Sequence, residues 1–145
     1  MRRTDDHRQR ALGTLGAVSY TIKNLRDIDD MAPKFGADQV QEARFAGRDL
    51  EAQETGLAFH VVKPGCRQAF AHRHEAAEEI YVVLSGRGRI KLDDEIADVG
   101  PFDAIRVAPK VARAFEAGSE GLELLAFGPR HEGDGDILRE DFWGS

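Results

Sequence analysis

Two histidines separated by one residue, with a glutamate shortly after them, are the residues of this sequence best suited to chemistry. His72 and His74 are followed by Glu79, which heads an apolar run over residues 80–84. Residues two apart in a strand project to the same face, so both imidazoles can point at one place and a carboxylate from the next strand can meet them. Two imidazoles and one carboxylate suit a divalent transition metal such as Fe, Mn, Ni, Cu or Zn. The competing interpretation leaves both histidines on a solvated strand face.

The elements that must position this trio are short strands. Apolar runs with turn residues between them predict strands over residues 57–63, 68–74, 79–84, 88–92, 95–99, 103–107, 112–117 and 122–127. Short strands at regular spacing, with no helical pattern among them, favour a closed barrel or a sandwich. We therefore expect an all-β fold.

The segments before and after these strands look different. Val18, Tyr20 and Ile22 alternate with polar residues and predict a strand over 18–25, whereas residues 27–54 are charged and alanine-rich. Within that stretch we expect a short helix over 38–45, capped by Asp38 and with Val40 and Phe45 facing inward. It would form a short helical N-terminal cover over one side of the body.

The sequence also predicts a division of the chain. We expect an N-terminal extension over 1–17, a barrel over 18–127 with its core at 55–127, and a C-terminal tail over 128–145. Phe142 and Trp143 close the polar tail, and such an aromatic pair is expected to pack on its own barrel or on a partner subunit.

The histidine motif resembles the first motif of the cupin family, which has the form H-x-H, three or four residues, E, six residues, G. His72 and His74, four residues, Glu79, six residues and Gly86 match it throughout, and this spacing selects Glu79 over Glu78. The resemblance covers residues 57–127 and implies a small double-stranded β-helix, or jelly-roll barrel, with the motif residues pointing into the barrel mouth. Because family members tend to pair their barrels, it also implies a homodimer.

The second cupin motif is degenerate in this chain. It has the form G, five residues, P-x-G, two residues, H, three residues, N, and none of its defined positions carries the expected residue; they fall on Phe102, Ala108, Lys110, Arg113 and Ala117. In metal-binding cupins the second-motif histidine completes the coordination shell. Arg113 occupies that position here.

Arg113 leaves two outcomes open, because a guanidinium has no free lone pair and stays protonated. In the first, His72, His74 and Glu79 hold a metal by themselves and leave open coordination positions. In the second, Arg113 replaces the charge of the metal, either by pairing with Glu79 or by presenting its guanidinium to a carboxylate or phosphate ligand. Repulsion between Arg113 and a divalent ion in a dry barrel favours the second outcome. A register slipped by one residue would instead turn Arg113 to solvent.

Three further residues are candidate ligand-binding groups beside Arg113. His60 shares a strand face with Val62 and either lines the pocket or packs in the core. Tyr81 shares the strand face of Glu79 and either offers a hydroxyl to the ligand or packs in the core. Phe115 lies two positions after Arg113 and is expected on the same face of its strand.

Composition limits the classes of function. The 145 residues carry 20 Lys+Arg and 26 Asp+Glu, a formal charge of -6, and the dense basic run is confined to the first ten residues, so nucleic acid is not an expected partner. The apolar stretch near the start is too short to span a bilayer. Asp5 and Asp6 interrupt the positively charged region that a signal peptide needs, so neither export nor membrane association is expected. The single cysteine, Cys66, indicates no disulfide. A cytoplasmic location is therefore expected.

Taken together, the sequence predicts a cupin that binds a small anionic molecule, either without a metal or with one transition metal. The alternative is a metal-dependent oxygenase or isomerase that uses His72, His74 and Glu79.

Overall fold

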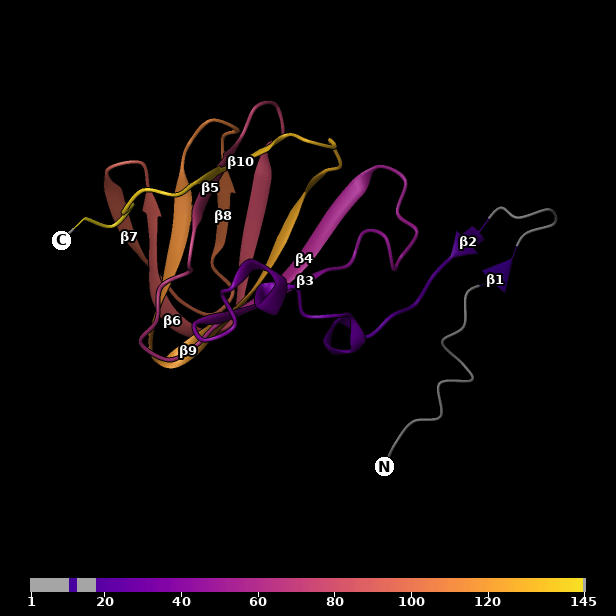
Figure 1. The fold of residues 1–145 in the computed structure, drawn as a ribbon. Helices are drawn as coiled ribbons and strands as arrows, with labels where there is room; N and C mark the ends of the chain where they lie inside the picture. Colours follow the sequence, from indigo (N-terminus) through magenta and orange to yellow (C-terminus); the bar gives the residue numbers. More distant parts are fainter. Residues whose placement is uncertain (1–10, 13–17, 145) are drawn as a thin grey trace.

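The computed structural model describes residues 11–12 and 18–144, and most of them lie in strands that curl into a barrel (Figure 1). A two-stranded hairpin and two short 3-10 helices precede the barrel. The elements in chain order are β1 (Ala11–Leu12), β2 (Val18–Tyr20), η2 (Leu25–Asp27), η3 (Ala32–Phe35), β3 (Gln41–Phe45), β4 (Thr55–Val62), β5 (Ala71–His74), β6 (Glu79–Leu92), β7 (Glu95–Val99), β8 (Ala104–Val107), β9 (Arg113–Pro129) and β10 (Gly135–Leu138).

Two long bent strands form the spine of the barrel. β6 and β9 pair antiparallel along most of their lengths, with register shifts at 83–85 and 86–88. The first half of β6 also pairs with β8 and its second half with β7, while β9 joins β4 and β5 and so connects the path β10-β5-β9-β4-β3. The sequence predicted two strands where β6 runs continuously, and two where β9 does. The all-β jelly-roll prediction is confirmed.

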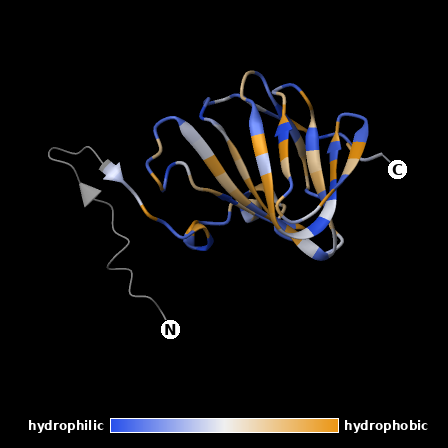
Figure 2. Cartoon of the chain, turned by 180° about the vertical axis from the view of Figure 1, so that it is seen from behind, coloured by the Kyte–Doolittle hydropathy of each residue, from blue (hydrophilic) through white to orange (hydrophobic). Residues whose placement is uncertain are grey.

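The inward faces of these strands make one apolar core. Hydrophobic and hydrophilic residues succeed one another along the strands, as Figure 2 shows, because neighbouring side chains point to opposite faces of a sheet. The buried members of the core are Ala58, Val62, Tyr81, Val83, Ile90, Val99, Val107, Phe115, Ala117, Leu122, Leu124 and Ala126.

The helix expected over residues 38–45 is wrong. Residues Gln41–Phe45 form β3, which pairs antiparallel with β4 from Gln41 opposite Val62 to Phe45 opposite Ala58. Ala43 is buried, Phe45 is 48% exposed, and the Ala43 amide donates to a carboxylate oxygen of Asp30. The free edge of β4 supplies backbone partners for the whole segment, and this tertiary pairing outweighs the helix propensity of its alanine, glutamate and arginine.

The helical part of the cover is small and consists of η2 and η3. The segment from η2 to η3 nevertheless covers one side of the barrel, because Ile28, Met31 and Phe35 line the cavity described below. The strand expected over 18–25 is shorter than predicted, since β2 ends at Tyr20 and pairs with β1. Most of the expected extension over 1–17 lies outside the described residues. Among those described, no helix is long and apolar enough to cross a membrane.

The C-terminal segment lies on the barrel itself. β10 pairs antiparallel with β5, from Gly135 opposite His74 to Leu138 opposite Ala71. Farther on, the guanidinium of Arg67 lies over the ring of Trp143 at 4.8 Å from its centroid. The homodimer and the cytoplasmic location stay predictions.

We expect Gly86→Ala to destabilise the protein by about 4 kcal/mol, because two costs coincide there. Gly86 adopts a φ of 81°, and a Cβ at this position would lie 1.9 Å from the carbonyl oxygen of Gly121 on the paired strand. Chemical denaturation of the wild type and the variant measures the loss.

Gly65→Ala is the matched control for the backbone strain alone. Gly65 has a φ of 69°, but a Cβ there would meet nothing within 4 Å, so the expected cost is about 1–2 kcal/mol. Equal losses for the two variants would contradict the close approach of β6 and β9 at Gly86.

Candidate functional site

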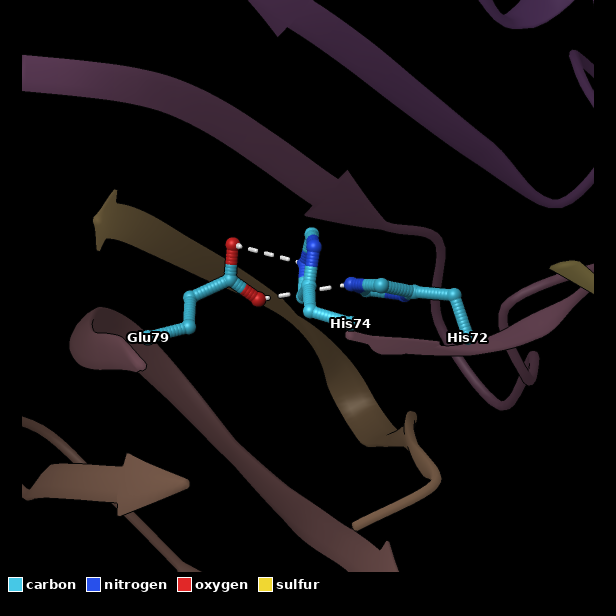
Figure 3. Close-up of side chains that lie close together, drawn as sticks. All are labelled: His72, His74 and Glu79. Atoms are coloured by element: carbon cyan, nitrogen blue, oxygen red, sulfur yellow. Dashed lines mark hydrogen bonds and ion pairs between the residues drawn. The ribbon is translucent and has the colours of Figure 1, made fainter. Parts of the chain in front are cut away.

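The three residues of the histidine motif meet at one wall of the barrel. β5 carries His72 and His74 on the same face, and Glu79 opens β6; in Figure 3 the three side chains point toward one another. One donor atom from each residue lies within 4.8 Å of the others. Nε2 of His72 is 3.3 Å from Oε1 of Glu79, and Nε2 of His74 is 3.7 Å from Oε2. The structure thus brings together the trio expected from the sequence. Glu78 instead pairs with Arg106 at the surface.

The Glu79 carboxylate is held in its charged form. Burial alone would raise the pKa of Glu79, but the adjacent side chains of His72, His74 and Tyr81 outweigh it and bring the pKa well below the usual value. The Tyr81 hydroxyl donates a hydrogen bond to Oε1 of Glu79. Burial and the adjacent carboxylate raise the pKa of Tyr81 well above its usual value, so this hydroxyl stays protonated.

Arg113 is buried beside His72. It lies opposite His72 in the pairing of β5 with β9, and its side chain is 1% exposed. Nε of Arg113 is 3.7 Å from Oε1 of Glu79, while Nη1 donates to the carbonyl oxygens of Pro109 at 3.2 Å and Val111 at 2.8 Å. Among the described residues, Nε and Nη2 have no hydrogen-bond acceptor. The guanidinium thus adds a positive charge beside Glu79, and the alternative of a solvent-facing Arg113 is wrong.

A carboxylate that the sequence did not single out lies on the far side of His74. Oδ2 of Asp134 is 3.3 Å from Nδ1 of His74. Although burial acts to raise the pKa of Asp134, hydrogen bonds from the backbone N–H groups of Ala77 and Ala76 lower it overall. Asp134 precedes β10, far from the motif in sequence, and only the pairing of β10 with β5 brings it here.

The trio opens onto a cavity of about 920 Å³. His72, His74, Glu79, Tyr81 and His60 all line it. Phe45, Phe70 and the segment before β3 contribute apolar walls. A cavity of this volume has room for a small organic molecule beside the histidines.

Two of the expected ligand-binding residues lie outside this lining. Neither Arg113 nor Phe115 belongs to the cavity wall. Phe115 is fully buried and packs edge to face on Tyr81, with the ring centroids 5.0 Å apart. Both residues are buried on β9 next to side chains that line the cavity, Arg113 opposite His72 and Phe115 against Tyr81.

His60 faces the cavity as a neutral imidazole. Burial, and to a smaller extent the charge of nearby His72, lowers the pKa of His60 to about 4, although Glu79 acts in the opposite direction. Its ring packs edge to face on Phe45, with centroids 5.8 Å apart. Nδ1 of His60 is buried and has no hydrogen-bond partner among the described residues. The ring therefore borders the cavity with its Nδ1 left unpaired among the described residues.

The donor set fits a metal ion. Nε2 of His74 is buried without a hydrogen-bond partner among the described residues, and it faces the charged Glu79, 3.7 Å from Oε2. Two imidazole nitrogens and one carboxylate oxygen match the preferences of a divalent transition metal. Arg113 cannot supply a further metal ligand, because its guanidinium has no free lone pair.

Comparisons with known proteins agree with this fold and motif. The cupin domain model Cupin_2 matches residues 58–128. An uncharacterized protein of Methanocaldococcus jannaschii is 35% identical over 85 residues, which cover 57% of this chain and 67% of that protein. The chain belongs to the cupin family.

Solved structures show the same barrel. A cupin protein from Bacteroides fragilis superposes with a TM-score of 0.62 at 22% identity, over 79% of this chain and 87% of that one. The polyketide cyclase RemF from Streptomyces resistomycificus superposes with a TM-score of 0.66 at 21% identity, over 83% of this chain and 87% of that one. At these identities the likeness concerns the fold.

We expect His60 to make the metal-free protein less stable as the pH falls from 6.5 to about 4. The unfolded chain takes up a proton on His60 below its ordinary pKa of 6.5, whereas the folded protein resists protonation until the pH reaches about 4. The free energy of unfolding should fall through this range by about 3 kcal/mol at most because of His60, and this contribution should level off at lower pH.

Urea denaturation at several pH values, on chelator-treated wild type and His60→Gln, measures this contribution as the difference between the two pH slopes. Parallel slopes would contradict the buried neutral state of His60.

Proposed function

We propose that this protein binds one divalent transition metal ion through His72, His74 and Glu79, and a small molecule in the adjoining cavity. The observation that carries the proposal is the convergence of three donor atoms within 4.8 Å on the wall of a cavity of about 920 Å³. Membership of the cupin family supports it, because the trio is the family's first motif.

The proposed roles follow from the surroundings of each residue. A metal ion held by the trio would act as a Lewis acid on an oxygen atom of the bound molecule. Tyr81 orients Glu79 through its hydrogen bond, and the neutral ring of His60 borders the space for the bound molecule. Phe45 and Phe70 contribute apolar surface that displaces water from the bound molecule. The likeness to a polyketide cyclase supports the barrel fold and does not indicate a reaction for this chain.

A second candidate is a metal-free binding protein for a small anion. The distance of 3.7 Å between Nε of Arg113 and Oε1 of Glu79 favours it, because the guanidinium already balances part of the charge of the carboxylate. In that case the bound anion would contact the histidines, while the buried guanidinium of Arg113 adds positive charge beside Glu79. Metal analysis separates the two candidates.

We expect chelator-treated protein, re-equilibrated with Mn²⁺, Fe²⁺, Co²⁺ or Zn²⁺ in turn, to retain about one equivalent of at least one of these ions. Elemental analysis after gel filtration measures the stoichiometry. Glu79→Gln should lower the affinity at least about tenfold because it removes the charged ligand. Glu78→Gln is the matched control, since that neighbour lies at the surface, and it should bind like wild type. If the wild type retains none of the four ions, the metal-free candidate replaces this one.

We expect Arg113→Met to strengthen binding of the retained ion by about tenfold or more. The substitution removes a positive charge that lies 3.7 Å from a ligand oxygen in a poorly screened environment. Arg106→Met removes an exposed arginine and should leave the affinity unchanged. Calorimetric titration of the folded variants measures both. An unchanged or weaker affinity in Arg113→Met would contradict the electrostatic role assigned to this residue.

A further inference from the structure

The turn before β10 places one carboxylate against the outer edge of the histidine cluster. Asp134 has a side chain that is 8% exposed, and its Oδ2 lies 3.3 Å from Nδ1 of His74. Its two carboxylate oxygens accept hydrogen bonds from the backbone N–H groups of Ala76 at 2.9 Å and Ala77 at 3.0 Å. Three separate contacts therefore fix the position of this carboxylate.

The backbone around Asp134 is tied to the strand that carries both histidines. The amide of Glu75 donates to the carbonyl oxygen of Asp134 at 3.1 Å, and Gly135 lies opposite His74 in the pairing of β10 with β5. On its other side, β5 pairs with β9 at the single position of His72 and Arg113. Most of the sheet pairing that holds β5 thus comes from the C-terminal segment.

The two nitrogens of His74 face different carboxylates. Nδ1 lies near Asp134, and Nε2 lies 3.7 Å from Oε2 of Glu79 on the cavity side. Within the described chain, neither nitrogen meets the geometry of a full hydrogen bond. A carboxylate beside one ring nitrogen of a histidine favours the proton on that nitrogen, which leaves the lone pair on the other.

We propose that Asp134 is a positioning residue that holds His74 in the tautomer protonated at Nδ1 and so points the lone pair of Nε2 at the cluster. The segment from His131 to Leu138 then belongs to the site, although the motif lies far from it in sequence. The expected consequence for metal affinity rests on the function proposed above, whereas the tautomer does not.

Nuclear magnetic resonance tests the tautomer on the full chain without metal. Two-bond correlations between the ring protons and nitrogens of ¹⁵N-labelled histidine should show His74 of the wild type protonated at Nδ1. Asp134→Ala should shift His74 toward the tautomer protonated at Nε2. Asp136→Ala, on the same segment but paired with Arg73 at the surface, should leave it unchanged. A wild-type His74 protonated at Nε2 would overturn the proposal without any variant, and so would an unchanged tautomer in Asp134→Ala.

Titration with Co²⁺ alone, monitored by visible absorption, tests the effect of Asp134 on metal affinity. Asp134→Ala should bind Co²⁺ about 10–100-fold more weakly than the wild type, and Asp136→Ala should bind it equally well. Equal affinities for wild type and Asp134→Ala would overturn the positioning role. If the wild type binds no Co²⁺ or other tested ion, the metal function fails, and the tautomer measurement still decides the role of Asp134.

Discussion

The charge of Glu79 inside the barrel is the constraint around which the site is organised. An isolated buried carboxylate costs several kcal/mol, so it persists only where donors and opposite charges surround it. His72, His74 and Tyr81 surround it at the cavity wall, and Nε of the buried Arg113 lies 3.7 Å from its Oε1. These partners keep the carboxylate ionised, which is also the state that a metal ligand requires.

Four strands must be in register for this arrangement to form. β6 supplies Glu79 and Tyr81, β9 supplies Arg113, β5 supplies both histidines, and β10 holds the outer edge of β5. The carbonyl oxygen of Pro109 accepts both the backbone amide of His74 and Nη1 of Arg113, so one turn ties the histidine strand to the buried cation. The barrel thus does more than enclose a cavity, because its pairing also sets the charge balance at the cavity wall.

Much of this was predictable from local patterns, and the rest depends on partners distant in sequence. Short apolar runs separated by turn residues predicted the barrel, and the spacing of the histidine motif selected Glu79 over its neighbour. The same reasoning failed for residues 38–45, because the unpaired edge of β4 decides their conformation. It could not find Asp134, since a lone aspartate in a polar tail carries no local signal until β10 pairs with β5. The position of Arg113 in the second cupin motif predicted that it lies near Glu79. The two carbonyl oxygens that accept hydrogen bonds from its guanidinium could be identified only from the fold.

The ligands that surround a metal ion bound to this protein decide whether His72, His74 and Glu79 form its site. X-ray absorption spectroscopy at the metal edge, on protein loaded with the ion it retains best, reads that coordination shell. Ligation by His72, His74 and Glu79 predicts a shell with imidazole scattering from two histidines and with carboxylate oxygen, and it predicts that the imidazole contribution is halved in His74→Ala. A shell of oxygen ligands without imidazole, or one that is unchanged in His74→Ala, would contradict it.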